Sequence, residues 1–167
     1  KNVMLDVLRP QWDRLRKALD TIRNDYDYCI IDCPPDIDMA TVNALAAADW
    51  VIIPVDCDEW AMDGMDEIRE QVDAIREAYN PQLEVMGVLA TKYTRGRYSV
   101  DTINEIANMD LPAFRNPDNS ILRIDYSVKV KEAKARHLPV HKVCRNIKTS
   151  AQYKALAQLV KKCVEGE

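Results

Sequence analysis

Asp32 is the residue of this sequence whose type and position most clearly suggest chemistry. It directly follows a run of four apolar residues, 28–31, and prolines stand at positions 34 and 35. Proline cannot continue the hydrogen-bond ladder of a sheet, so the pattern predicts a buried strand that ends in a stiff loop carrying the acid. Nucleotide-hydrolysing enzymes need an acid at such a place to hold Mg²⁺ or its water shell. An acid at a strand end also commonly caps the next helix, and both interpretations stay open from the residues alone.

Two further apolar runs end in polar residues. Residues 50–54 precede Asp56 and Asp58, and residues 85–90 precede Thr91. Ligands of open α/β sheets bind beyond the carboxyl ends of the strands. We therefore expect these side chains at the same edge of a sheet as Asp32.

The elements that must position these residues can be read from the hydrophobic periodicity. Apolar residues recur at helical spacing in several segments, and the expected helices cover about 8–22, a stretch beginning after Asp36 or Asp38, 61–78, Ser99 to 108, 126–136 and 150–164. Short strands are expected at 28–31, 50–54, 85–90 and near 111–114, and an apolar run follows at 121–124. Apolar strands separated by helices are typical of a parallel sheet. The predicted fold class is α/β, a three-layer sandwich with a mostly parallel sheet, in a single domain over residues 1–167.

Composition excludes several classes of protein. No run of 18 apolar residues exists, so no membrane span is expected. Five scattered cysteines without a C-x-x-C pair indicate reduced thiols rather than a disulfide framework or a zinc site. His137 and His141 are spaced as on one helical turn, but Pro139 between them argues against a helix and favours surface histidines. The sequence has no G-x-S-x-G, so nucleophilic hydrolase chemistry has no support.

The charge is unevenly distributed along the chain. Residues 1–114 hold 11 Lys and Arg against 22 Asp and Glu, whereas residues 115–162 hold 12 against 3. A basic segment of this kind can face a polyanion, or it can simply be a solvated surface. The charge pattern alone does not decide between the two.

A resemblance to a known family covers most of the chain. The stretch 26–36, YDYCIIDCPPD, resembles the YDYIIIDTPPS segment of the ParA/MinD family of deviant Walker ATPases. Further matches follow in the family's order: NAL and AAD at 43–49, IPVDCDEWAMDGM at 53–65, MGVL with Thr91 and Tyr93, KEA at 131–133, LPV at 138–140 and AQY at 151–153. The chain is similar above all to ParA and Soj partition proteins. The match spans about residues 8–164 and resembles the C-terminal portion of a P-loop NTPase domain whose N-terminal strands are missing.

The resemblance implies an ATPase for plasmid or chromosome partitioning that dimerises on ATP. Its cofactors are ATP and Mg²⁺ in the full-length protein, with none expected in this fragment. Asp32 matches the aspartate that acts near Mg²⁺, through water, and near the attacking water molecule. Cys33 and Pro34 match the nucleotide-contacting switch, and Thr91 matches a position at the nucleotide base.

The family also implies partners. As an ATP-bound homodimer it binds double-stranded DNA without sequence preference, and a centromere-binding ParB-like protein stimulates hydrolysis. Non-specific duplex binding needs several cations on one surface. The matching basic positions here are Arg95, Arg97, Lys129, Lys131, Lys134 and Arg136. The expected location is the bacterial cytoplasm, in association with the nucleoid and without membrane attachment.

The sequence also departs from the family pattern. The KGGVGKT loop that holds the phosphates and the LIDLDPQ segment do not occur in these 167 residues, so this chain alone is not expected to hydrolyse ATP. Residues 124–127, IDYS, replace the family's IPRN, which puts base contacts there in doubt. The alternatives are a non-catalytic DNA-binding or scaffold module that has lost its nucleotide loop, and a MinD-like membrane-associated ATPase. A bacterial tyrosine kinase is disfavoured, because the terminal tyrosine cluster of that class is missing.

Overall fold

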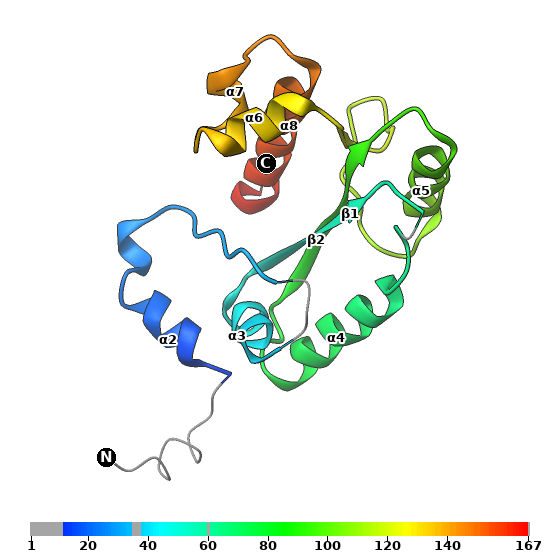
Figure 1. Ribbon diagram of the computed structural model, residues 1–167. Helices are drawn as coiled ribbons and strands as arrows, with labels where there is room; N and C mark the ends of the chain where they lie inside the picture. The colour runs from blue at the N-terminus through cyan, green and yellow to red at the C-terminus, as the bar shows by residue number, and fades with distance from the viewer. Residues whose placement is uncertain (1–11, 35–37, 60, 167) are drawn as a thin grey trace. The chain divides into compact units, whose positions relative to one another are not determined.

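The computed structural model of the chain describes residues 12–34, 38–59 and 61–166. This part of the chain divides into two compact units: one contains the residues up to Val51 with Gly64–Glu84, and the other contains Ile52–Asp63 with the residues from Val85 onward. Figure 1 follows the elements along the chain, which are α2 (Arg14–Asp20), a 3-10 helix (Arg23–Asp25), α3 (Met39–Ala47), β1 (Trp50–Asp56), α4 (Met65–Ala78), β2 (Glu84–Tyr93), α5 (Arg97–Asn108), β3 (Arg123–Asp125), α6 (Val128–Ala135), α7 (Val140–Val143) and α8 (Lys148–Glu165).

The first unit is helical and packs around α3. The Asp38 carboxylate caps this helix by accepting hydrogen bonds from the backbone N–H groups of Ala40 and Thr41, at 2.9 and 3.1 Å. Of the two caps that the sequence allowed, Asp38 is confirmed, whereas Asp36 lies outside the described residues. At the other end of α3, the buried Asn80 side chain donates to the carbonyl oxygens of Leu45 and Ala48. Side-chain hydrogen bonds therefore hold both ends of α3.

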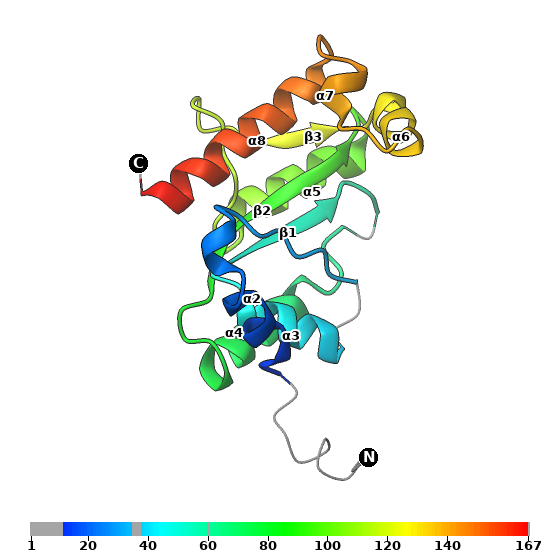
Figure 2. The same ribbon diagram turned by 90° about the vertical axis from the view of Figure 1, so that its left-hand side faces the viewer.

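The second unit contains most of a three-stranded sheet in the order β1-β2-β3. Strands β2 and β3 are parallel, with Ala90 opposite Arg123 and Tyr93 opposite Asp125. Helices α5 and α8 lie on opposite faces of this sheet, so the unit has three layers (Figures 1 and 2). The prediction of an α/β fold with a parallel sheet is confirmed.

The core of the second unit is apolar and closely packed. Gly87 lies against Phe114, and a Cβ atom at Gly87 would stand 3.1 Å from the Phe114 ring. Other buried members of this core are Val88, Leu89, Ala90, Ile106, Leu122 and Ile124. The apolar run that predicted the strand at 85–90 is therefore a core strand, as expected.

The strand predicted at 28–31 is wrong for the described structure. These residues have no regular secondary structure, and the sheet of the described residues does not include them. Ile30 is 94% exposed. An apolar run becomes a strand only where neighbouring strands pair with its backbone, and the sheet of the described residues consists of β1, β2 and β3 without residues 28–31.

Three smaller expectations need correction. Helix α5 begins at Arg97, with Gly96 rather than Ser99 at the N-cap position. Residues 111–114 contribute only an isolated bridge between Ala113 and Val88 instead of a strand. Helix α4 begins at Met65 rather than near residue 61, because Gly64 before it has a left-handed φ of 81°.

The C-terminal helical segments agree with their periodicity. Helix α6 ends at Ala135, Pro139 separates it from α7, and α8 extends to Glu165. Among the described residues, no helix combines the length and the apolar character needed to cross a bilayer.

Candidate functional site

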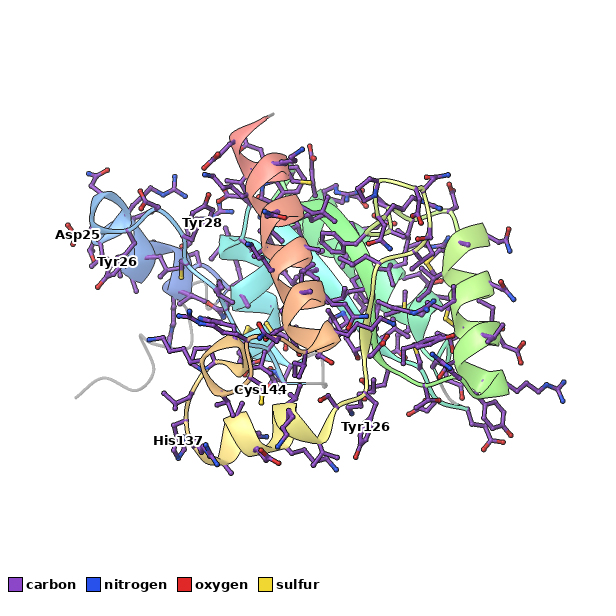
Figure 3. The ribbon with its side chains drawn as sticks, turned by 90° about the horizontal axis from the view of Figure 1, so that it is seen from above. Asp25, Tyr26, Tyr28, Tyr126, His137 and Cys144 are labelled. Atoms are coloured by element: carbon purple, nitrogen blue, oxygen red, sulfur yellow. The ribbon has the colours of Figure 1, made fainter. Side chains whose placement is uncertain are left out.

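Asp32 lies in the first unit, on the extended segment that leads toward α3. Its side chain is exposed, as are those of Cys33 and Pro34. Figure 3 labels Tyr26 and Tyr28 on the same segment and Asp25 just before it. Asp32, Cys33 and Pro34, which were predicted from the family's switch segment, are therefore exposed. The strand predicted directly before them does not form.

The chemistry of this segment is set by two carboxylates beside a thiol. Although the Cys33 side chain is exposed, neighbouring protein atoms partly desolvate its thiol and raise its pKa, and the negative charges of Asp32 and Asp38 raise it further. The thiol therefore stays protonated at neutral pH, and a protonated thiol is a poor nucleophile.

The segment fits Mg²⁺ only with help from other ligands. Within the described ranges, no group of three His, Cys, Asp or Glu side chains could hold a metal ion. Magnesium in nucleotide sites is typically held by one or two carboxylates together with waters and substrate phosphates. One exposed carboxylate at Asp32 suits that arrangement, with phosphate oxygens and waters as the remaining ligands.

Thr91 lies in the second unit, at the carboxyl end of β2, as expected. Its hydroxyl donates to Oδ1 of Asp56 at 2.5 Å and lies 3.2 Å from the carbonyl oxygen of Val55. The Thr91 carbonyl in turn accepts the N–H of Cys57 at 2.8 Å. The Thr91 side chain therefore already has a donor role inside the protein, toward the end of β1.

Asp56 holds two groups of β2 at once. Its other carboxylate oxygen pairs with the Lys92 ammonium group. Burial acts to raise the pKa of Asp56, but hydrogen bonds from Lys92 and Thr91 outweigh it and lower the pKa. The bond to Asp56 also raises the pKa of Lys92. Both groups are therefore charged at neutral pH. Sequence reasoning placed Asp56 at a strand end without assigning it a role, and the pairing with Lys92 has no signal in the sequence.

Cys57 is a structural thiol. It is 7% exposed, and burial, together with the charges of Asp56 and Asp58, raises its pKa to about 11. A thiol with such a pKa is neutral and unreactive near pH 7.

The first predicted basic segment follows directly after β2. Arg95 is exposed in the loop, and Arg97 is the first residue of α5, with a side chain that is 90% exposed. Arg97 lies 3.6 Å from Asp101, one turn further along the helix. Such an exposed pair is weak, so Arg97 remains available to an external anion.

The second predicted basic segment is α6 and the residue after it. Lys129, Lys131, Lys134 and Arg136 are all exposed. Lys129 donates to both carboxylate oxygens of Glu132 at 2.8 Å, and the Lys131 ammonium group lies 5.4 Å from the centre of the Tyr126 ring. Figure 3 labels Tyr126 before the start of α6 and His137 just after its end.

The two basic segments leave the sheet from neighbouring positions. The N–H of Tyr126 donates to the carbonyl oxygen of Tyr93 at 2.8 Å, and the guanidinium carbon of Arg123 lies 3.9 Å from the centre of the Tyr93 ring. Since β2 and β3 are parallel, the chain continues from both strands at the same edge. Segments more than 30 residues apart in the sequence thus place cations at one edge of the second unit.

His137 and His141 do not share a helix. His137 has a left-handed φ of 53° between α6 and α7, and His141 lies within α7. The helix break predicted from Pro139 is confirmed.

Comparison with known proteins gives a consistent picture. Residues 2–85 match the family model described as an AAA domain. The chain is 34% identical over 155 residues to an uncharacterised protein of Pseudomonas putida, covering 93% of this chain and 57% of that protein. It is 36% identical over 129 residues to the chromosome partitioning protein ParA of Caulobacter vibrioides, covering 76% of this chain and 47% of that one. The chain thus spans about half the length of these relatives.

A solved structure supports the fold. The cobyrinic acid a,c-diamide synthase of Mycobacterium smegmatis, with a bound ATP analog and magnesium, superposes with a TM-score of 0.78 at 27% sequence identity. The match covers 99% of this chain and 60% of that one. The α/β arrangement described above is therefore the arrangement found in a nucleotide-binding protein.

Proposed function

Because the chain belongs to the AAA-domain family as a ParA-type partition ATPase, we propose that it forms part of an enzyme that couples ATP hydrolysis to non-specific binding of double-stranded DNA. Proteins of this family are P-loop ATPases, and the chain shares their α/β fold. In this proposal the protein acts in plasmid or chromosome partitioning, in the bacterial cytoplasm and in association with the nucleoid.

The observation that carries the DNA part of the proposal is the convergence of the two basic segments. Arg95 and Arg97 follow β2, α6 follows β3, and the bond from Tyr126 to Tyr93 joins the two departure points. Duplex binding without sequence preference depends on several cations that displace counterions from the phosphates. The six cations Arg95, Arg97, Lys129, Lys131, Lys134 and Arg136 are all exposed, and they follow these two departure points, which suits that task.

The nucleotide part of the proposal rests on the Asp32 segment and on relatives of the chain. Asp32 would help to hold Mg²⁺ through water and orient the attacking water, with Cys33 and Pro34 beside the phosphates. Thr91 would lie at the base end. When bound, Mg²⁺ would supply charge neutralisation for the phosphates. The neutral Cys33 thiol fits this role, because it adds no negative charge beside the phosphates.

The proposal includes two protein partners. A second copy of the chain would join in an ATP-dependent homodimer, and a centromere-binding ParB-like protein would stimulate hydrolysis. Both come from the family to which the chain belongs.

The test is performed on the natural polypeptide that contains these 167 residues. ATP turnover is measured with and without duplex DNA, and Asp32→Ala is expected to abolish it. DNA binding is measured over a series of salt concentrations. Arg95→Ala and Lys129→Ala should each lower the slope of log K against log[salt] by about 1, because each removes one phosphate contact. Arg69→Ala, which removes an exposed cation of α4, is the matched control and should leave the slope unchanged.

Two outcomes would contradict parts of the proposal. Salt-sensitive DNA binding without any ATP turnover would favour the non-catalytic DNA-binding module. Turnover with a salt slope that Arg95→Ala and Lys129→Ala leave unchanged would refute the assigned DNA surface.

A further inference from the structure

The segment Lys92–Arg97, which joins β2 to α5, has an unusual backbone. Lys92 has a left-handed φ of 51°, which is uncommon for a residue that carries a Cβ atom. The register of β2 against β3 is irregular between Ala90 and Tyr93, so Lys92 lies in a bulge. Bulges often redirect a side chain beside a functional site. Here the bulge immediately precedes the loop that carries Arg95.

Asp56 holds the beginning of this segment. It accepts a hydrogen bond from the Thr91 hydroxyl at 2.5 Å and pairs with the Lys92 ammonium group. These two contacts tie Thr91 and Lys92, near the end of β2, to the end of β1. These contacts span 35 and 36 residues of sequence, and all of them lie within the second unit.

Ser99 holds the other end of the segment. Its buried hydroxyl donates to the carbonyl oxygen of Cys57 at 3.1 Å and accepts the N–H of Thr94 at 3.1 Å. Asp56, the last residue of β1, and Cys57, which follows it, are therefore the anchors on either side of the loop. The short span between these anchors contains Arg95, and Arg97 follows at the start of α5.

We propose that Asp56 is a positioning residue for segment Lys92–Arg97, which it holds so that Arg95 and Arg97 point at the DNA backbone. This role rests on the proposed DNA binding, but it makes a prediction of its own, which is the sign of the change in DNA affinity when Asp56 is replaced. Charge alone predicts the opposite effect, because an acid close to a DNA-binding loop repels phosphates and its removal should strengthen binding. The sign of the change in affinity therefore separates positioning from simple electrostatics.

The experiment compares Asp56→Ala with Asp110→Ala in the natural polypeptide. Asp110 is an exposed acid of the same unit, just beyond α5, and its replacement makes the same change in net charge. Binding of a fluorescent duplex is followed by anisotropy at fixed salt. Asp56→Ala should weaken binding by roughly tenfold, the effect of losing about one charge-assisted hydrogen bond. Asp110→Ala should leave binding unchanged or slightly tighter.

A double-mutant cycle with Lys92→Met tests the route by which Asp56 acts. If Asp56 acts through Lys92, then Asp56→Ala should have a much smaller effect in the Lys92→Met background than in the parent. Equal effects in both backgrounds would refute this route. DNA binding by Asp56→Ala that is as tight as by Asp110→Ala would overturn the proposal.

Amide hydrogen exchange of residues 92–100, measured without DNA, tests the positioning role of Asp56 separately from the proposed DNA-binding function. Faster exchange in Asp56→Ala than in Asp110→Ala, confined to this segment, supports positioning, and equal exchange refutes it. If the parent binds no duplex DNA with or without ATP, the proposed function fails, and the exchange measurement alone then decides whether Asp56 orders the loop.

Discussion

Asn80 provides a sharp test of how the first unit is held together. Its side chain is 4% exposed, and its amide nitrogen donates to the carbonyl oxygens of Leu45 and Ala48, at 3.0 and 2.7 Å. These carbonyls lie at the C-terminal end of α3, where the last carbonyl groups of a helix have no partner within the helix. The amide of Asn80 thus supplies hydrogen bonds that α3 cannot make for itself.

The expected cost of removing this amide follows from the two bonds. A hydrogen bond between neutral groups contributes about 1 kcal/mol, and a buried acceptor that is left unpaired adds a desolvation cost. We therefore expect Asn80→Ala to lower the free energy of unfolding by about 2–3 kcal/mol. Asn80→Asp keeps the shape but directs a carboxylate at two carbonyl oxygens, so it should be at least as destabilising near pH 7. This variant should recover part of its stability at low pH, where a protonated carboxyl can donate again.

The assay is urea unfolding followed by circular dichroism. Asn108→Ala is the matched control, because the Asn108 amide donates to the Asn104 carbonyl at 2.7 Å from an exposed position on α5. This control should change stability by less than about 0.5 kcal/mol. An Asn80→Ala variant as stable as the control would show that the two bonds do not hold α3.

Three further predictions concern other contacts. Asp38→Ala removes the N-cap of α3 and should cost about 1 kcal/mol in urea unfolding, whereas Asp38→Asn should cost much less. Gly87→Ala places a methyl group 3.1 Å from the Phe114 ring and should cost about 1–3 kcal/mol, and a variant of wild-type stability would mean that the ring moves freely. Burial acts to raise the pKa of Asp125, but the bond from Lys148 at 2.6 Å, among others, lowers it. The resulting stability is present above the carboxyl's unfolded pKa of about 3.9 and is lost as the pH falls through the lower folded pKa. The free energy of unfolding should therefore fall more between pH 5 and pH 2 in the parent than in Lys148→Met.

Local patterns in the sequence predicted most of the elements of the second unit correctly. The apolar runs at 50–54 and 85–90 became β1 and β2, and the periodic stretch at 150–164 became α8. Such elements depend on contacts among residues a few positions apart, together with a buried face, so their periodicity carries the information. The run at 28–31 has the same local pattern but is not a strand here, because pairing depends on neighbours that local sequence does not specify.

The sequence by itself determined the class of the fold, the family of the chain, and which residue types could contact a phosphate or a metal ion. Collinear motifs carried the family assignment, and the charge distribution pointed to the basic segments. Only the tertiary structure decided that Asp56 holds Thr91 and Lys92, and that the bond from Tyr126 to Tyr93 brings two basic segments to one edge. These contacts join residues more than 30 positions apart, and their geometry depends on strand register and on a bulge. No local periodicity encodes either of them, which is why the sequence named the basic residues but not what positions them.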